Sequence, residues 1–339
     1  MASDGVGSRV KADFEKLLVA LQRGLPLCSR PFAAIADDLG CSEDEVLAAE
    51  AQARSEGLVR RFGAVFDTRR LGYKSALCAA TVPADELEAR SAQLTPLVGV
   101  THCYVREPLP AGDAVLPNLW FTLSYPGDIF SAMAGEVAAR LKPYEVHVLP
   151  ALKRYKVDVV FGAATRAREE QVEDDLPPLT ARERRLVGAL QGDTEVRSDY
   201  FAGIAEKLGV KEWDVLSLLH VWARKGRLKR IGLLLRHRAA GWTANGMCCW
   251  RVDGDTTEAG RALAARGEVT HCYERPFAPN FPYNLFAMVH AHATDESRAQ
   301  FAALDAHLAE TLGHSVSGTL LLSTREFKKT SMTFFADVR

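Results

Sequence analysis

The chain has 339 residues, of which 47% are hydrophobic and 25% charged, and its formal net charge is −1. These values are typical of a globular protein with an ample core, and near-zero charge argues against bulk attraction to nucleic acid or an anionic membrane. The seven cysteines show no Cys-x-x-Cys spacing, which argues against a disulfide framework or a structural zinc site. We see no signal peptide and no apolar stretch long enough to span a bilayer, so we expect a cytoplasmic protein.

Residues 14–57 predict a small helical unit. Apolar residues recur at helical spacing from Phe14 to Gln22, Pro31 opens a second helix, and Ser42 with Glu45 forms the capping signal of a third. Two helices joined by a tight turn are typical of a helix-turn-helix. The pattern returns in the second half of the chain, with helices predicted over 181–190, 200–208 and 211–225.

A β-rich stretch follows each helical unit. In the first half we predict two strands joined by a turn at Leu71-Gly72-Tyr73, and then a helix, two strands, a second helix and further strands. The order β-α-β-β-α-β is that of a ferredoxin-like domain, in which helices cover one face of an antiparallel sheet. The predicted strands are 61–67, 76–82, 98–105, 119–125, 145–148 and 152–161, and the predicted helices are 84–92 and 129–141.

An internal repeat relates the two halves. Val100–Tyr104 and Val269–Tyr273 have the same five residues, and the offset of 169 also relates Gly63 to Gly232. A repeat of this length indicates a duplicated domain. We therefore expect an α+β tandem duplication whose halves pack as an internal pseudo-heterodimer, while further homodimerisation stays open. The expected divisions are helix-turn-helix (winged-helix-like) units at 1–62 and 179–230, ferredoxin-like domains at 63–163 and 231–339, and a linker at 164–178.

The helix-turn-helix units raise the hypothesis of a DNA-binding regulator. A recognition helix needs cations for phosphate and donors for base edges. The candidate in the first unit, residues 42–56, carries five acidic residues against the single cation Arg54. The candidate in the second unit presents Trp213, Leu219 and Trp222, which we expect to pack rather than to bind DNA. We therefore expect no nucleic acid partner and no membrane partner.

The repeated segments hold the strongest candidates for chemistry. Each places a histidine two residues before a tyrosine and four before an arginine. A neutral imidazole can transfer a proton near pH 7 or bind iron, although a histidine on an apolar strand is also commonly a structural residue. The candidate catalytic residues are His102, Tyr104, Arg106, His271, Tyr273 and Arg275.

Basic clusters flank these segments, and two interpretations of them stay open. Arginine grips carboxylates bidentately, so grouped arginines suit a ligand with several carboxylates. Alternatively, these side chains are solvated charges that protect the edges of a sheet. The repeated Asn-Leu-aromatic segments at Asn118 and Asn284 would suit an apolar disc fringed with carboxylates. The candidate binding residues are Arg61, Arg69, Arg70, Asn118, Trp120, Arg154, Lys156, Arg230, Arg236, His237, Arg238, Asn284 and Lys328.

Together, these motifs resemble those of the siroheme decarboxylases, Lrp/AsnC-like enzymes of the heme d1 and alternative heme pathways. The resemblance rests on Arg61–Tyr73, the two Val-Thr-His-Cys-Tyr segments, Asn118–Phe121 and Arg325–Lys329, and it extends over both halves. It implies that a fused chain removes two acetate carboxyl groups from siroheme, giving 12,18-didecarboxysiroheme, with no organic cofactor. No structural metal is expected, and His271 or His237 is a candidate axial contact for the substrate iron.

The chain departs from the family pattern in two places. Thr68 stands where the Phe-Asp-His-Arg pattern has histidine, whereas the second copy reads Leu235-Arg236-His237-Arg238. The two copies are therefore not equivalent, and a single active site is one interpretation. The alternative functions are an Lrp/AsnC-type transcriptional regulator and a tetrapyrrole sensor or carrier.

Overall fold

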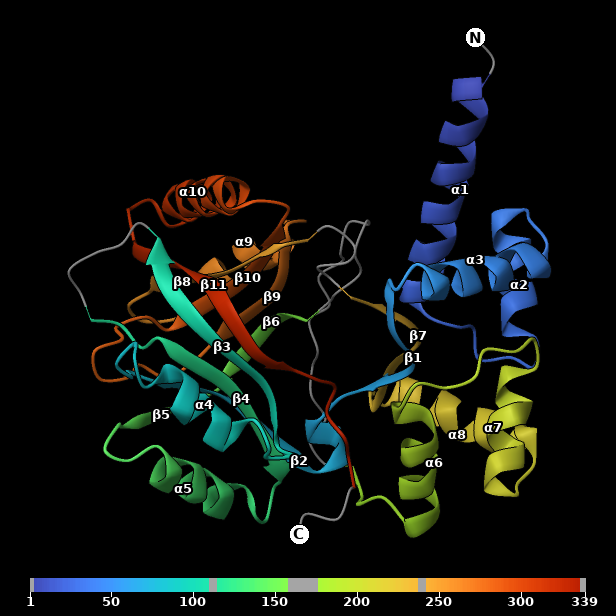
Figure 1. Ribbon diagram of the computed structural model, residues 1–339, viewed down its shortest axis with the longest axis horizontal. Coiled ribbons are helices and arrows are strands. Elements are labelled where there is room, and N and C mark those ends of the chain that lie inside the picture. The colour runs from blue at the N-terminus through green and yellow to red at the C-terminus, as the bar shows by residue number, and fades with distance from the viewer. Residues whose placement is uncertain (1–2, 110–114, 158–175, 237–241, 336–339) are drawn as a thin grey trace.

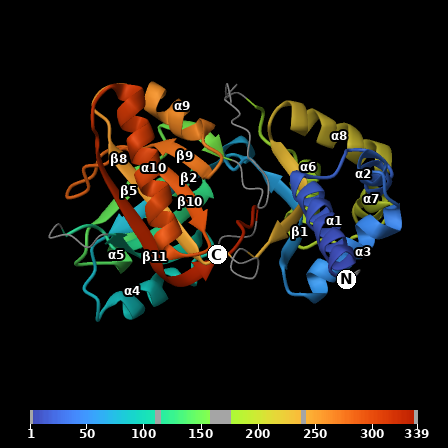
Figure 2. The ribbon, with the colours of Figure 1, turned by 90° about the horizontal axis from the view of Figure 1, so that it is seen from above.

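The protein folds into a helical lobe and a sheet lobe, shown side by side in Figures 1 and 2. The computed structural model describes residues 3–109, 115–157, 176–236 and 242–335. The helical lobe combines both helix-turn-helix units with a two-stranded ribbon. Its elements are α1 (Ser3–Arg23), α2 (Pro31–Leu39), α3 (Glu43–Ser55), β1 (Val59–Phe66), α6 (Ala181–Gln191), α7 (Tyr200–Leu208), α8 (Glu212–Arg224) and β7 (Leu228–Leu235).

The helix starts follow the sequence signals. Ser42 caps α3 in a reciprocal capping box with Glu45, as predicted. Thr180 and Glu183 form the same arrangement at the start of α6. Leu219 and Trp222 are buried as expected, but Trp213 is 77% exposed. It precedes Leu219 by six residues, a helical rotation of about 240° that turns it away from the packed face.

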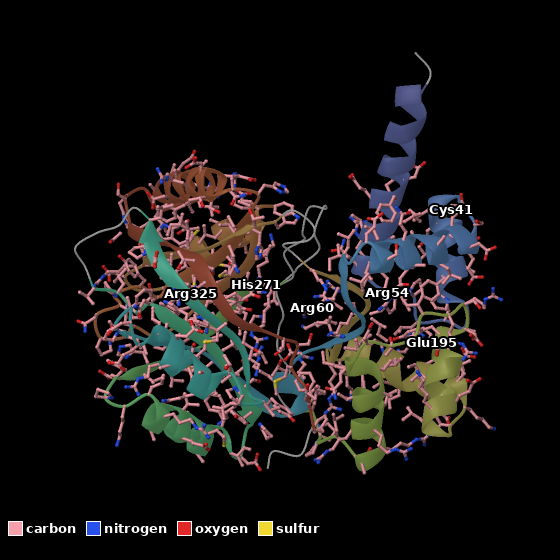
Figure 3. All side chains as sticks on the ribbon, in the orientation of Figure 1. Cys41, Arg54, Arg60, Glu195, His271 and Arg325 are labelled. Carbon is pink, nitrogen blue, oxygen red and sulfur yellow. The ribbon has the colours of Figure 1, made fainter. Side chains whose placement is uncertain are left out.

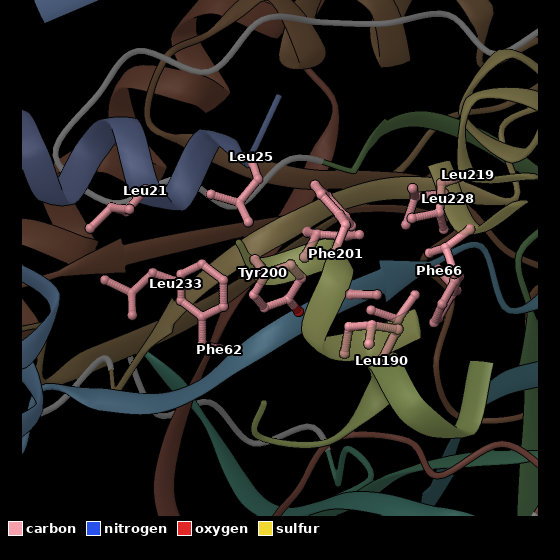
Figure 4. Packing of buried hydrophobic residues seen from close by; sticks show 14 of the residues in the cluster. Leu21, Leu25, Phe62, Phe66, Leu190, Tyr200, Phe201, Leu219, Leu228 and Leu233 are labelled. Carbon is pink, nitrogen blue, oxygen red and sulfur yellow. The ribbon is translucent and has the colours of Figure 1, made fainter. Parts of the chain in front are cut away.

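The ribbon joins the two halves inside the helical lobe. Strands β1 and β7 are antiparallel, and Gly63 lies opposite Gly232 at the centre of their pairing. A Cβ on Gly63 would overlap the carbonyl oxygens of Gly192 and Leu190 near the end of α6, and one on Gly232 would overlap the Leu21 carbonyl of α1. Helix α6 of the second half thus packs against β1, and α1 of the first half packs against β7. The apolar side chains of both units form one core (Figure 4).

The first two predicted strands follow each other through a turn, as expected, but they do not pair with each other. Strand β1 pairs with β7 and not with β2, because a short 3-10 turn, η1 (Arg69–Leu71), redirects the chain between them. The predicted divisions after residues 62 and 230 consequently fall inside β1 and β7. Most of the predicted linker lies outside the described residues.

The sheet lobe contains two ferredoxin-like units. Their strand orders are β5-β2-β4-β3 and β11-β8-β10-β9, and together with β6, which lies beside β9, they form one nine-stranded sheet. The elements of the first unit are β2 (Tyr73–Ala80), α4 (Leu87–Leu94), β3 (Val100–Leu109), β4 (Leu119–Pro126), α5 (Phe130–Arg140), β5 (Val146–Pro150) and β6 (Lys153–Val157). Those of the second are β8 (Ala244–Arg251), α9 (Thr257–Ala265), β9 (Val269–Glu274), β10 (Leu285–Ala291), α10 (Thr294–Leu312) and β11 (Ser317–Lys329).

Exchange of terminal strands joins the two units. Strand β11 pairs with β8 in its first part and with β3 of the other unit in its second part, while β6 pairs with β9. Because only Ala151 and Leu152 separate β5 from β6, the two ends of the sheet are brought together. The sheet therefore curls around an interior, with the helices on its outer faces (Figure 1).

This arrangement gives the packed halves that the repeat predicted. The outer faces of the two units hold separate apolar cores, and a further apolar cluster, which includes Trp120, Met247 and Phe286, fills part of the interior between them. Within the described ranges, no helix is long and apolar enough to cross a membrane.

Candidate active site inside the curled sheet

Alternation along β3 and β9 turns the candidate catalytic residues into the interior. Cys103 and Val105 of β3 pack in the outer core, as Cys272 of β9 does in the other unit. Successive side chains of a strand point to opposite faces. His102, Tyr104 and Arg106 of β3, together with His271 and Tyr273 of β9, consequently face inward.

The two repeated histidines are surrounded by protein on most sides. Their side chains nevertheless keep some exposed surface. His102 Nδ1 lies 2.9 Å from Thr101 Oγ1, and His271 Nδ1 lies 3.1 Å from Thr270 Oγ1. The repeated threonine thus orients the repeated imidazole, leaving Nε2 as the second ring nitrogen.

The surroundings of both imidazoles favour the neutral form. Burial lowers the pKa of His102 to about 3, and the nearby charges of Arg60, Lys329, His271 and Arg106 act in the same direction. Burial, followed by the charge of Arg275, lowers the pKa of His271 to about 4. Both imidazoles are therefore uncharged near neutral pH in the ligand-free protein.

A third histidine belongs to this site and was not predicted. His290 lies on β10, and burial together with His271, Lys329 and Arg106 lowers its pKa to about 3. Its inward orientation follows from the alternation along β10, because Phe286, four residues earlier on the same face of the strand, packs in the interior. His290 lines a cavity together with Tyr104, Trp242, Thr243, Asn245, Ser323, Glu326 and Lys329.

Two buried arginines lie beneath the tyrosines. The Arg106 guanidinium lies 5.5 Å from the centre of the Tyr104 ring, and that of Arg275 lies 4.8 Å from the centre of the Tyr273 ring. Burial lowers the pKa of each to about 10. Among the described residues neither makes an ion pair with a carboxylate. A buried cation without a counter-ion is costly, so both positions favour an incoming anion.

Arg60, on the ribbon, also reaches this region, although it was not among the predicted residues. Its Nη2 donates to Ser331 Oγ at 2.8 Å, and its buried Nε has no partner. Burial lowers its pKa, while Tyr104 and Arg236 lie within electrostatic range. Figure 3 shows Arg60 between the ribbon and the sheet lobe, near His271 in that view.

The neighbouring Arg61 serves mainly the helical lobe. It donates to Ser331 Oγ and the Ala64 carbonyl, and Asp193 and Tyr200 are among the groups near it. Arg230 lies close to Arg61, on the ribbon. Substrate binding by Arg61 stays a prediction, and its neighbour Arg60 is a further candidate.

Asp67 organises a separate cluster near Tyr273. Its carboxylate lies 3.3 Å from Arg154 Nη1 and 3.5 Å from Lys229 Nζ. It also accepts hydrogen bonds from the backbone N–H groups of Arg69 and Arg70. The Arg70 guanidinium instead donates to the Lys225 carbonyl.

Five further candidates have structural roles. The side-chain amides of Asn118 and Asn284 each form two hydrogen bonds to the backbone, of Val82 and Val252 respectively, which occupies the groups expected to bind substrate. Trp120 donates to the Pro117 carbonyl within the apolar interior.

Lys156 and Lys328 likewise bind backbone carbonyls. In all five positions the polar groups are used to hold the fold together. His237 and Arg238 lie outside the described residues, so the second candidate for an axial iron contact does too.

The duplicated fold and this interior define a class: an AsnC-like protein whose inward-facing imidazoles and nearby arginines suit a polyanionic small molecule. Family models agree, because residues 70–156 and 239–328 match the AsnC-like ligand binding domain. Residues 14–60 match the siroheme decarboxylase NirDL-like helix-turn-helix domain.

Similar proteins identify the family within this class. A siroheme decarboxylase of Hydrogenobacter thermophilus is 33% identical over 96% of both chains, and the NirDL subunit of Paracoccus pantotrophus is 36% identical over 93% of this chain and 94% of its own. The crystal structure of the siroheme decarboxylase NirDL superposes with a TM-score of 0.72 at 30% identity, covering 96% of this chain and 95% of its own. The chain belongs to the siroheme decarboxylase family.

A shorter relative matches only one half of the chain. The beta subunit of the Methanosarcina barkeri siroheme decarboxylase is 37% identical over 44% of this chain and 95% of its own length. Two units that are separate subunits elsewhere are therefore fused here, as the internal repeat predicted.

Proposed function

We propose that this chain is a siroheme decarboxylase that removes two acetate carboxyl groups from siroheme to give 12,18-didecarboxysiroheme, a carboxy-lyase reaction of heme d1 or alternative heme biosynthesis. The observation that carries the proposal is the joining of inward-facing imidazoles and buried arginines in one curled sheet. Family membership over nearly the whole chain supports it.

The arginines bind and orient the substrate. Siroheme carries acetate and propionate carboxylates around an apolar macrocycle, and a guanidinium in a water-poor interior binds a carboxylate strongly. Arg106, Arg275 and Arg60 present donors to the interior without a carboxylate partner among the described residues. Fixing the carboxylates that do not react holds the reacting acetate in one geometry.

In each decarboxylation the bond between the acetate methylene and its carboxyl carbon breaks. The carboxyl group leaves as CO₂, the electron pair stays on the methylene carbon, and one proton is added there to leave a methyl group. The step has no net change of oxidation state, so we propose that no organic cofactor takes part. The iron enters with the substrate.

Histidine supplies the proton in this scheme. In the ligand-free protein, burial and nearby cations keep His102 and His271 neutral. When substrate carboxylates neutralise Arg60, Lys329 and Arg106, the repulsion on His102 falls and its pKa rises, because opposite charges favour the protonated form. Substrate binding thus favours the protonated form of His102, which donates the proton in the reaction. An axial approach of His271 to the substrate iron is the alternative role for that residue.

The test is anaerobic incubation of the purified protein with siroheme, followed by mass spectrometry of the tetrapyrrole. We expect loss of one and then two CO₂. Siroheme that binds with unchanged mass would contradict the proposal in favour of a carrier or sensor, and tight binding of a specific DNA duplex would favour a regulator. His271→Ala should abolish or severely reduce turnover, whereas the exposed His314→Ala should not.

A further inference from the structure

Arg60 lies at an interruption in the alternation of β1. Phe62 and the alternate residues after it pack in the core of the helical lobe. Because successive side chains of a strand point to opposite faces, regular alternation would bury Arg60 in that core too. The register of β1 against β7 shifts between Val59 and Arg61, however, so Arg60 is the extra residue of a bulge. The bulge keeps Val59 in the core and turns Arg60 away from it.

The other strand of the ribbon has the same bulge. The register of β7 skips Lys229, which corresponds to Arg60 by the 169-residue offset, while Leu228 and Ile231 stay in the core. Lys229 Nζ lies 3.5 Å from the Asp67 carboxylate. Bulges commonly redirect a side chain beside a functional site. Each bulge in the ribbon therefore carries a cation out of the helical core to a defined partner.

The partner of Arg60 is Ser331, on the segment that follows β11. Ser331 Oγ accepts from Arg60 Nη2 at 2.8 Å and from Arg61 Nε at 3.0 Å. A hydroxyl oxygen has two acceptor lone pairs, which matches these two donors. Among the described residues the Arg60 side chain makes no other hydrogen bond and no ion pair, and its buried Nε has no partner. Ser331 is thus the group that orients the Arg60 guanidinium.

Contacts with both lobes hold Ser331 in place. It belongs to a crossing segment, residues 330–335, and in Figure 1 the red chain beyond β11 passes between the lobes. The first N–H of this segment donates to the Thr101 carbonyl of the sheet lobe at 2.8 Å. Further along, the Gln191 side chain of α6 binds the backbone N–H and carbonyl of Phe334 at 2.7 and 3.1 Å. The Phe334 ring is buried in the helical core.

The oriented guanidinium lies close to the candidate catalytic residues. Burial, and then the charge of Arg60, lowers the pKa of His102 to about 3. Tyr104 also lies within electrostatic range of Arg60. Because the Ser331 hydroxyl is neutral, it fixes the guanidinium without neutralising its charge. That charge is therefore left for a carboxylate of the ligand, which a guanidinium binds strongly.

We infer that Ser331 is a positioning residue for the substrate: its hydroxyl fixes the bulged Arg60 in the geometry that binds a substrate carboxylate. The inference rests on the proposed function for the identity of the ligand. Without this hydrogen bond, the Arg60 side chain would lose its rotamer freedom only when the ligand binds, which weakens binding by about threefold to tenfold. With Ser331 present, that freedom is already lost in the folded protein.

The test is an anaerobic spectral titration with iron-uroporphyrin III, a macrocycle ringed by carboxylates, used as a probe that binds without requiring turnover. Ser331→Ala should raise the Kd about threefold to tenfold, and Ser331→Thr, which keeps the hydroxyl, should stay within about twofold of the parent. The matched control is Thr333→Ala, which removes an exposed hydroxyl two residues further along the crossing segment. Its Kd should equal that of the parent.

A double-mutant cycle shows whether Ser331 acts through Arg60. Arg60→Gln should raise the Kd at least about tenfold, the order expected for loss of a hydrogen bond from a charged group. Adding Ser331→Ala to Arg60→Gln should change the Kd by less than about twofold, because the hydroxyl then has no guanidinium to position. Added to Arg61→Gln, the same Ser331→Ala change should keep its full effect.

A parental Kd in Ser331→Ala, or independent losses from Ser331→Ala and Arg60→Gln in the double variant, would overturn the inference. So would a Ser331→Ala effect that disappears only in the Arg61→Gln protein, since the hydroxyl would then serve Arg61. If Ser331→Ala does not fold, as judged by its unfolding transition, Ser331→Cys takes its place with the same expectation, because a thiol is a weak acceptor.

Siroheme turnover is scored separately by mass. A protein whose variants bind the probe as expected but which leaves siroheme intact would contradict only the proposed function. Turnover of siroheme together with a parental Kd in Ser331→Ala would contradict only the positioning role of Ser331.

Discussion

Lys156 and Lys328 form equivalent hydrogen bonds between the two halves. Lys156 Nζ donates to the Arg266 carbonyl at 2.7 Å, and Lys328 Nζ donates to the Leu97 carbonyl at 2.9 Å. Arg266 and Leu97 are related by the 169-residue offset. Each lysine crosses from the exchanged strand of one half to the end of a helix in the other. These residues hold the halves together and do not contact the cavity.

Replacing Lys328 by Met should therefore lower the free energy of unfolding and leave the affinity for the substrate analogue iron-uroporphyrin III unchanged. The variant leaves the Thr95 and Leu97 carbonyls without their donor, at a cost of about 1–3 kcal/mol. Urea unfolding measures the loss, and the exposed Lys207→Met is the control, expected to lie within about 0.5 kcal/mol of the parent. A stable Lys328→Met protein with weakened binding of iron-uroporphyrin III would restore the original binding interpretation.

His290→Gln should reduce siroheme turnover at least tenfold while the protein stays folded. General acid–base groups typically contribute about 100-fold or more to a rate, and an imidazole that only positions another contributes less. His220→Gln, on the exposed side of α8, is the control. Turnover equal to that of the parent would remove His290 from the reaction.

Stability of the ligand-free protein should fall as the pH is lowered from about 6.5 to 5. The pKa values of His102, His271 and His290 are lowered to about 3, 4 and 3, below the value of about 6.5 for an unfolded histidine. The unfolded state therefore binds protons that the folded state does not, and protons favour unfolding in this range. Each histidine contributes up to about 1.4 kcal/mol per pH unit.

Urea unfolding at pH 7.5 and pH 5 measures this dependence. His102→Gln should make it shallower, whereas His220→Gln should not make it shallower by a comparable amount. Asp67, whose pKa is lowered from 3.8, contributes only at lower pH and does not enter this window. Equal stability of the parent at both pH values would contradict the burial of these imidazoles in their neutral form.

Gly63→Ala should destabilise the helical lobe. The new Cβ would overlap the carbonyl oxygens of Gly192 and Leu190, which are backbone atoms, so α6 must shift away from the ribbon. Overpacking of this kind costs about 1–3 kcal/mol. Gly135→Ala in α5 is the control, since nothing lies within 4 Å of its new Cβ and it should gain up to about 1 kcal/mol. Thermal unfolding of both variants measures these changes in stability.

Local patterns in the sequence predicted most elements well. The capping residues Ser42 and Glu45 placed the start of α3, and Tyr200–Leu208 was predicted to the residue. The histidine, tyrosine and arginine of each repeat were expected to lie together, and the period of two along a strand brings them to one face. The backbone partners of the Asn118 and Asn284 amides were not predicted, because sequence does not reveal which partner a side-chain amide finds.

What the sequence determined by itself is the duplication, the α+β class and the repeated histidines, since these follow from an offset and from short-range periodicity. The division into one helical lobe and one sheet lobe, each built from both halves, was not predicted. Only the tertiary structure decided that β1 pairs with β7, that β6 and β11 cross between the halves, and that His290 joins the site. It also decided that Asp67 and Arg236, which occupy equivalent positions, have different partners: Arg154 and Lys229 for Asp67, and the Val59 carbonyl for Arg236. The reason is physical: these outcomes depend on burial and charge among residues far apart in the chain, which no local pattern encodes.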